Sequence, residues 1–256
     1  MDMMHWIEDR GIETGIFPAL RAVSPALRVW FTSRRGGKSR PPFDSLNLGI
    51  GTGDVRSDVM GNRRLVADIL GLDRRRIARG DQVHGTAIAT VERGGVSPGT
   101  DGLITAKRGL ALAINTADCF PVVLHSPPEM VLCAVHAGRE GAAGRILSGA
   151  VAALAEDFGA DPGHIVAACG PGICAGCYEV SAGEARRFPG EAVRKRGEAY
   201  FLDLRAALRR DALEAGVRKA NWFEAGECTS CDPSRFYSYR RDRGRTGRHW
   251  TVALMV

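Results

Sequence analysis

The chain has 256 residues, 45% of them hydrophobic, which is enough to bury a large core in one domain. Its formal net charge of +6 comes from arginine-rich clusters, which are typical of solvated surface and also attract phosphate-bearing ligands or nucleic acid. No apolar run is long enough to span a membrane, and the N-terminus has no apolar signal segment, so we predict a cytoplasmic protein with no membrane partner.

The N-terminal part predicts one strand followed by a basic turn. Residues 1–27 are weakly patterned and are expected as a peripheral lead-in to a single domain spanning residues 1–256. Leu27–Thr32 has the composition of a strand and leads into Ser33–Ser39, where adjacent glycines free backbone amides beside three cations. Such a turn could hold an anion, although a Gly-Gly turn is more often only a surface turn.

The next segments predict a helix followed by a strand. The helix is expected to begin with Ser57 or Asp58 as its N-cap and to run to Leu70, because Gly71 follows as a stop signal. Beyond the helix, Ile77–Val91 ends in the alternating sequence TAIATV, which indicates a strand.

The central region predicts strand-like runs with polar residues at their ends. Leu103–Leu124 contains two runs separated by Thr116–Cys119, and a third run at Met130–Val135 stops at His136. The sequence Ala-Gly-Arg-Glu-Gly then leads into a helix. A glycine-bearing loop at a helix N-terminus is a natural anion site, because free amides and the helix dipole point there together.

The C-terminal half predicts two amphipathic helices and two strands. The first helix has the apolar stripe Leu147, Val151, Leu154 and Phe158 and closes at Gly159. The remaining elements are a strand at Ile165–Cys169, a helix from the cap Asp203 to Ala215 and a closing strand at His249–Met255. Interleaved strands and helices indicate an α/β (α+β) fold, with mixed β-sheets packed between α-helices.

Three residues with metal-ligand chemistry stand at the predicted strand ends. Cys119 and His136 each end an apolar run, and His84 stands in the sequence QVHG at a strand entrance. A thiolate and two imidazoles suit zinc, and three protein ligands leave the open position that is typical of catalytic sites. The hypothesis is a catalytic zinc site made by His84, Cys119 and His136.

The other cysteines invite a different interpretation. Seven cysteines without a signal segment argue for free thiols or metal ligands rather than disulfides, and Cys133 and Cys169 lie inside apolar strands as core residues. Two Cys-x-x-Cys pairs remain, Cys174 with Cys177 and Cys228 with Cys231. About fifty residues separate the pairs, far more than in the usual four-cysteine zinc site, so the spacing favours reduced thiols or small buried side chains.

A series of ordered motifs covers nearly the whole chain. In chain order they are TSRRGGKS, LNLG, QVHG, TDGLIT, TADCFPVVL, AVHAG, GPGICAGCYEV, FYSYRRD and TGR. Together they resemble the bacterial YfiH/YlmD-type family, also called the laccase-domain, DUF152 or peptidoglycan-editing-factor family. The resemblance implies a single-domain, YfiH-like layered sandwich.

The resemblance also implies a site and an activity. His84, His136 and Cys119 map onto the zinc ligands of the family. The implied chemistry is phosphorolysis of adenosine, inosine, guanosine or methylthioadenosine, together with hydrolytic deamination of adenosine. Arg34, with the neighbouring glycine amides, is the candidate phosphate ligand, and Asn47 is the candidate ligand for the sugar or the base.

The chain departs from the family pattern beside His136. Members commonly have HAGWRG or HAGWKG there, whereas this chain has HAGREG, so Arg139 replaces a tryptophan and Glu140 replaces a basic residue. Arg139 is therefore a second candidate phosphate ligand, and Glu140 a candidate general acid or base. The laccase label implies copper oxidation, which requires many histidines, but the chain has six and no His-x-His pair.

Two other interpretations remain open. An amidase that edits peptidoglycan precursors would use Cys119 as its nucleophile. A basic, zinc-stabilised nucleic-acid-binding module would use the paired cysteines and the terminal arginines, but few aromatic residues interleave with the basic ones, so no nucleic-acid partner is expected. The expected partners are purine nucleosides and phosphate, and the sequence leaves monomer and homodimer open.

Overall fold

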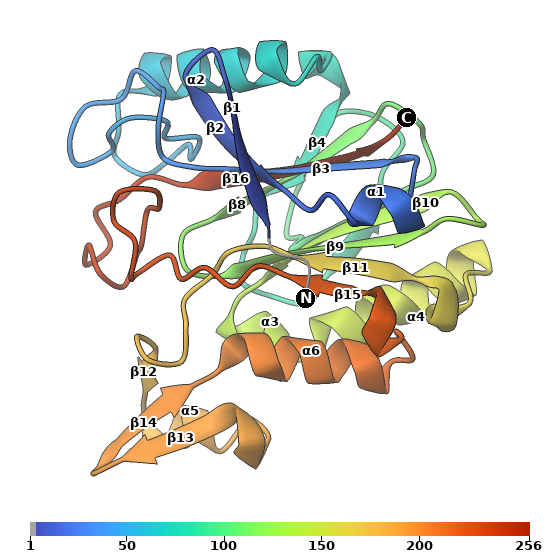
Figure 1. The fold of residues 1–256 in the computed structure, drawn as a ribbon, viewed down its shortest axis with the longest axis vertical. Helices are drawn as coiled ribbons and strands as arrows, with labels where there is room; N and C mark the ends of the chain where they lie inside the picture. Colours follow the sequence, from blue (N-terminus) through green and yellow to red (C-terminus); the bar gives the residue numbers. More distant parts are fainter. Residues whose placement is uncertain (1–3) are drawn as a thin grey trace.

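The computed structural model describes residues 4–256 as a layered α/β sandwich (Figure 1). The larger sheet has seven strands: β1 (His5–Asp9), β2 (Ile12–Ile16), β3 (Leu27–Thr32), β16 (His249–Met255), β8 (Ala111–Thr116), β4 (Ile77–Gly80) and β6 (Gly95–Ser97). The second sheet has six strands: β15 (Trp222–Glu224), β11 (Val166–Cys169), β9 (Phe120–Ser126), β10 (Val131–Ala137), β7 (Gly102–Thr105) and β5 (Ile88–Thr90). Both sheets mix parallel and antiparallel pairs, as the predicted fold class requires.

Helices cover the two outer faces of this pair of sheets (Figure 1). The helices are α1 (Leu20–Val23), α2 (Arg56–Ile69), α3 (Arg139–Ala143), α4 (Ile146–Phe158), α5 (Ala182–Ala185) and α6 (Leu204–Glu214). Helix α2 lies on the seven-stranded sheet, and α3, α4 and α6 lie on the six-stranded sheet. A small third sheet projects beside α5 and contains β12 (Glu179–Val180), β14 (Ala199–Leu202) and β13 (Val193–Arg196).

The alternation of side chains along β10 shows how the layers are joined. Leu132 and Ala134 point to one face and pack in the apolar cluster shared by the two sheets. Cys133 and Val135 point to the other face and pack against α4 and α6. Every residue of β10 is buried, which explains why this strand is apolar at consecutive positions.

Several predicted elements are confirmed with their boundaries. Strands β3 and β16 span the predicted residues, and Gly159 ends α4 in the left-handed conformation with φ 72°. The side chain of Asp203 caps α6 by accepting a hydrogen bond from the amide of Ala206 at 3.0 Å. The predicted core cysteines, Cys133 and Cys169, are both fully buried.

The structure also corrects three predictions. The run predicted from Leu103 to Asn115 is two strands in different sheets, because a turn with Gly109 at φ 69° carries the chain from β7 to β8. Helix α2 begins at Arg56 with Val55 as its N-cap, so the predicted capping by Ser57 or Asp58 was wrong. Asp58 instead places its carboxylate in the first turn, where the helix dipole favours it.

The third correction concerns the loop after His136. The segment expected as a glycine-bearing loop forms the short helix α3, and a left-handed Arg145 with φ 60° separates it from α4. The first amides of α4, those of Leu147 and Ser148, donate hydrogen bonds to the buried carboxylate of Asp211 on α6. A side chain from another helix therefore occupies the N-terminus of α4.

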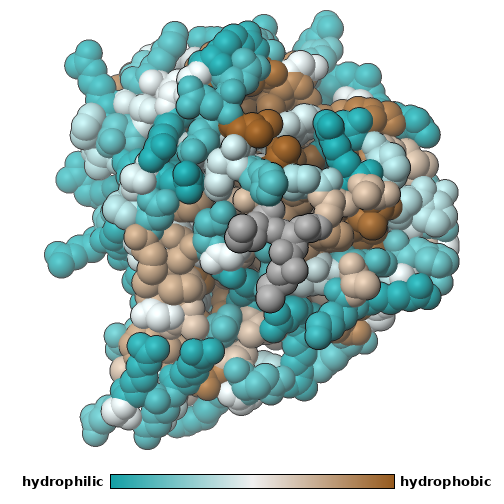
Figure 2. All heavy atoms as spheres, in the orientation of Figure 1, coloured by the Kyte–Doolittle hydropathy of each residue, from teal (hydrophilic) through white to brown (hydrophobic). Residues whose placement is uncertain are grey.

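The N-terminal segment belongs to the larger sheet. Residues 5–16, expected within a peripheral lead-in, form β1 and β2 at one edge of the seven-stranded sheet. Hydrophilic side chains cover most of the face in Figure 2, and the hydrophobic residues there are scattered rather than joined into one patch. Within residues 4–256, no helix is both long and apolar enough to cross a membrane.

Buried His125 on β9 predicts an acid-sensitive fold. Burial lowers the pKa of His125 to about 4, so the folded protein keeps this imidazole neutral at pH 5. An unfolded chain with an ordinary histidine pKa of about 6.5 binds a proton there, so stability falls as pH decreases below about 6.5. When the pH is lowered from 7 to 5, the unfolding free energy of the wild type should decrease by about 2 kcal/mol more than that of His125→Leu. Urea unfolding at both pH values measures this difference.

The exposed histidine of β1 provides the control for that experiment. His5→Leu makes the same substitution at a histidine that is exposed at the sheet edge, and it is measured in parallel. Equal pH dependence in wild type and His125→Leu would show that His125 takes up a proton in the folded state.

Candidate functional site

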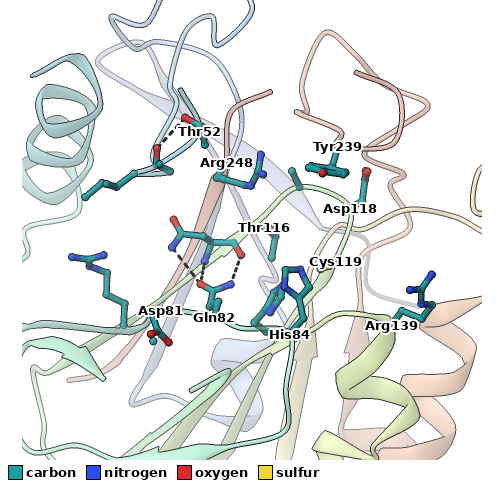
Figure 3. A pocket seen from close by; sticks show the side chains of 18 of the residues that line it. Thr52, Asp81, Gln82, His84, Thr116, Asp118, Cys119, Arg139, Tyr239 and Arg248 are labelled. Carbon is teal, nitrogen blue, oxygen red and sulfur yellow. Dashed lines mark hydrogen bonds between the residues drawn. The ribbon is translucent and has the colours of Figure 1, made fainter. Parts of the chain in front are cut away.

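The structure brings the three predicted metal ligands together at one end of the sheets. His84 lies in the loop between β4 and β5, Cys119 directly precedes β9, and His136 lies near the end of β10. One ligand atom from each residue lies within 4.8 Å of the others. Figure 3 shows the imidazole of His84 beside Cys119.

Left-handed backbone conformations, with positive φ, occur at or next to two of these three residues. His84 has φ 62°, and Asp118, immediately before Cys119, has φ 90°. Gln82, with φ 57°, pins the His84 loop to β8, because its side-chain amide donates to the carbonyl of Asn115 and accepts from its amide at 2.7 and 2.8 Å. Left-handed residues other than glycine cost about 1–3 kcal/mol each and cluster at functional sites.

Asp101 is the supporting residue that the sequence analysis missed. Its buried carboxylate accepts hydrogen bonds from His136 Nδ1 at 2.8 Å, from the amide of His84 at 2.9 Å and from the amide of Gly85 at 2.7 Å. The bond to Nδ1 leaves Nε2 of His136 as the free ligand atom, as in carboxylate–histidine–metal arrangements. The TDGLIT motif contained Asp101, but only the fold shows that it contacts two ligand segments.

The electrostatics of the three residues favour a thiolate. Burial opposes ionisation of Cys119, but the charge and hydrogen bonds of His136 and His84 outweigh it and lower the pKa of Cys119 to about 6. Burial likewise disfavours a charged His136, but Cys119 and Asp101 together raise its pKa. A thiolate between two imidazoles is the ligand form that a soft metal requires.

Gly138 leaves room for this cluster. A Cβ atom at this position would lie 3.1 Å from Cys119 Sγ, 3.2 Å from His84 Cδ2 and 3.7 Å from His136 Cε1. Glycine in the AVHAG motif therefore keeps the space between the ligands clear. The donor set, its orientation and the free space fit a three-ligand metal site with an open position.

A cavity of about 760 Å³ opens next to the ligands and is rich in arginine. Arg63, Arg79 and Arg248 line it, and within residues 4–256 none of the three forms an ion pair with a carboxylate. Burial lowers the pKa of all three guanidinium groups, that of Arg63 to about 9. Arg63 is buried and the other two are half-buried, and cations withdrawn from water without anionic partners are costly, so this wall of the cavity is suited to an anion.

The two residues proposed for substrate binding in the N-terminal part do not reach the cavity. The guanidinium of Arg34 donates to the carbonyls of Asp44 and Pro233, pairs with the Asp44 carboxylate at 3.2 Å and stacks on Tyr237. Asn47 is fully buried. Its amide donates to Thr52 and Asp54 and accepts from the amides of Gly49 and Arg248. Both side chains therefore stabilise the fold through contacts within the protein. The sequence motifs could not distinguish this structural role from ligand binding.

Removing the side chain of Asn47 should therefore destabilise the protein. Asn47→Ala breaks four hydrogen bonds in a fully buried position, so we expect a loss of about 2–3 kcal/mol in unfolding free energy. Asp54→Ala removes only one of these four bonds and should cost less. Urea unfolding compares the two variants, and an Asn47→Ala protein as stable as wild type would contradict this structural role.

Arg139 and Glu140, the departures from the family pattern, do line the cavity. Arg139 contacts Glu184 and Glu140, and Glu140 also pairs with Arg187 at 2.8 Å. The hydrogen bond from Arg187 is the main reason that the pKa of Glu140 lies below its ordinary value. The negative charge that Glu140 introduces beside the metal ligands is therefore offset by two arginines.

The four remaining cysteines also come together. One sulfur from each of Cys174, Cys177, Cys228 and Cys231 lies within 4.8 Å of the others. The linear spacing gave little support for a shared site, but a parallel backbone bridge between Gly172 and Cys228 brings the two distant segments side by side. Linear spacing identifies only those metal sites whose ligands belong to one local unit.

Fold and site define the class of this protein. Residues 28–256 match the family described as multi-copper polyphenol oxidoreductase laccase. The chain belongs to this family. The resemblance to YfiH/YlmD-type proteins and the predicted fold class are thereby confirmed.

Relatives and solved structures agree with this assignment. The chain is 41% identical to the purine nucleoside phosphorylase of Deinococcus radiodurans over 239 residues, which cover 92% of each chain. It is 41% identical to the purine nucleoside phosphorylase of Streptomyces coelicolor over 227 residues, covering 85% of this chain and 91% of the other. The structure of YlmD from Geobacillus stearothermophilus superimposes with a TM-score of 0.92 at 34% identity, covering 100% of this chain and 99% of that one.

Proposed function

We propose that the protein is a zinc-dependent purine nucleoside phosphorylase, acting on adenosine, inosine, guanosine or methylthioadenosine, and that the same site deaminates adenosine. The observation that carries the proposal is the cavity in which His84, Cys119 and His136 face arginines without carboxylate partners. The names of the relatives in Deinococcus and Streptomyces support the same activity.

The arginines provide the phosphate site. Arg248 donates from Nη1 to the carbonyls of Thr246 and Gly247, which fixes the guanidinium and leaves its other nitrogens available at the cavity. Arg79 lines the same cavity and has no ion-pair partner within residues 4–256. Two guanidinium groups held in place can grip the oxygens of one phosphate and position it for attack on the ribose anomeric carbon.

The wall near Cys119 provides surfaces for the nucleoside. Tyr178, Ile173 and Leu204 line this part of the cavity, and their apolar surfaces suit the flat purine ring. Glu140 is held as a carboxylate by Arg187, so in this proposal it accepts a proton or a hydroxyl hydrogen bond. A zinc ion held by His84, Cys119 and His136 would supply Lewis acidity at its open coordination position.

The two proposed reactions are separated by their products. Purified protein is incubated with adenosine with and without phosphate, and the products are resolved by chromatography. Adenine that forms only with phosphate demonstrates phosphorolysis, and inosine that forms in either case demonstrates deamination. Absence of both products from zinc-loaded protein would refute the proposed function.

The proposed phosphate site predicts a selective kinetic defect. Arg248→Ala should raise the KM for phosphate about tenfold or more, because a charge-assisted hydrogen bond contributes about 1.5–3 kcal/mol. Arg34→Ala is the matched control and should leave this KM unchanged, since Arg34 is engaged by Asp44 and Pro233 outside the cavity. Initial rates at varied phosphate and saturating nucleoside measure both. Equal phosphate KM values in the two variants would contradict the assignment.

A further inference from the structure

The cluster of Cys174, Cys177, Cys228 and Cys231 lies apart from the cavity and is not needed for the proposed reaction. The first three sulfurs belong to half-buried residues, and Cys231 is exposed. None of the four lines the cavity that contains His84 and Cys119. Four cysteines converging from two segments therefore require a separate explanation.

We propose that these four cysteines bind one zinc ion in a closed, structural site that fastens together the two loops on which they lie. Cys177 and Cys231 have their sulfurs 3.4 Å apart, and Cys174 and Cys231 have theirs 3.9 Å apart. Tetrahedral zinc with Zn–S bonds of about 2.3 Å requires neighbouring sulfurs about 3.8 Å apart. Side chains that already stand at this spacing need little movement to close around the ion.

The backbone around the cluster has the features of a thiolate site. The amide of Cys174 donates to Cys228 Sγ at 3.2 Å, the kind of backbone contact that supports a metal ligand. The amide of Cys177 donates to the carbonyl of Cys174, and the amide of Asp232 donates to the carbonyl of Cys228. Each Cys-x-x-Cys pair is thus folded into a tight turn. Four thiolates this close repel one another, and a divalent cation removes that repulsion.

The two loops that carry the four cysteines contact the segment that precedes Cys119. Thr229, between the cysteines of the second pair, donates its hydroxyl to Asp118 at 2.7 Å, and the amide of Ile173, next to Cys174, donates to the carbonyl of Asp118 at 2.9 Å. Asp118 is the left-handed residue that directly precedes Cys119. The structural ion would therefore hold in place the segment that presents Cys119.

Metal counting in reciprocal variants tests the proposal. Native protein purified with reductant should contain two zinc ions per chain, whereas Cys119→Ala and Cys231→Ser should each contain one, and the double variant none. Ser230→Ala, which changes one of the two residues between Cys228 and Cys231, is the matched control and should retain both ions. The count in Cys119→Ala tests the cysteine cluster independently of the catalytic site and of any nucleoside turnover.

The Cys231→Ser variant could lose its metal because it fails to fold. Two further measurements therefore use protein in which all four cysteines of the cluster are present. Cobalt replacing zinc in Cys119→Ala should show strong sulfur-to-cobalt charge-transfer absorption at one cobalt per chain. Iodoacetamide should label Cys231 of the wild type at least about tenfold faster after a chelator has removed the metal. A Cys119→Ala protein without stoichiometric metal, or native protein with these cysteines joined as disulfides, would overturn the proposal.

Discussion

Cys119→Ala is expected to lose catalytic zinc and nucleoside turnover together. The variant removes the only thiolate from a three-ligand site, and two imidazoles alone hold zinc far less tightly. Loss of the metal removes several kcal/mol of transition-state stabilisation, so turnover should fall at least about a thousandfold. Metal content by mass spectrometry and phosphorolysis of adenosine at saturating phosphate provide the two readouts.

Cys133→Ala is the matched control for this result. Cys133 lies on β10, three residues before His136, but its thiol is fully buried in the apolar cluster against α4 and α6. Its replacement should lower stability slightly and leave metal content and turnover intact. If Cys119 is rapidly alkylated in zinc-loaded protein, its thiolate is not a ligand, and the amidase interpretation with a cysteine nucleophile gains the support that the phosphorylase loses.

Asp101→Asn is expected to weaken zinc binding or turnover about 10–100-fold. The Asp101 carboxylate accepts three hydrogen bonds, from His136 Nδ1 and from the amides of His84 and Gly85. An asparagine side chain has one oxygen and one NH₂ group, so at least one of these donors would face another donor. His136 would lose its fixed tautomer, or the His84 loop would shift.

A second aspartate provides the control that separates the effect of Asp101→Asn from a general loss of folding. Asp81 lines the same cavity and accepts only the amide of Thr100, at 3.2 Å, so Asp81→Asn should retain wild-type zinc affinity. Affinity is measured by competition with a chromophoric chelator, and thermal unfolding monitors the fold. Unchanged affinity in Asp101→Asn would mean that the aspartate supports the backbone alone.

The candidate metal ligands could be predicted because their residue types and the family motifs both point to them. Cys119 and His136 each stand at the end of an apolar run, and His84 stands in the QVHG segment that leads into β5. The family motifs then linked the three residues, although they are separated by up to fifty-two positions in the chain. Asp101 could not be assigned in this way, because one acidic residue in a turn has the same local pattern whether it faces solvent or two ligand segments.

The proposed phosphate site shows the opposite case. The basic turn at Arg34 has the local features of an anion site, yet Asp44 and Pro233 occupy its guanidinium. Arg248 is part of the TGR motif and Arg79 belongs to none of the motifs, but only their shared cavity points to a common role. Whether a cation is available to a ligand depends on its neighbours in space, which the order of residues does not specify.

The sequence by itself determined the alternation of strands and helices and the apolar strands of the core, and its family motifs named His84, Cys119 and His136 as candidate metal ligands. These properties follow from side-chain periodicity and from residue chemistry, both of which can be read within short segments. Only the tertiary structure decided that Asp101 supports two ligands, that Arg248 is available while Arg34 is not, and that four distant cysteines meet. Each of these depends on pairing between strands and loops far apart in the chain, such as the bridge from Gly172 to Cys228.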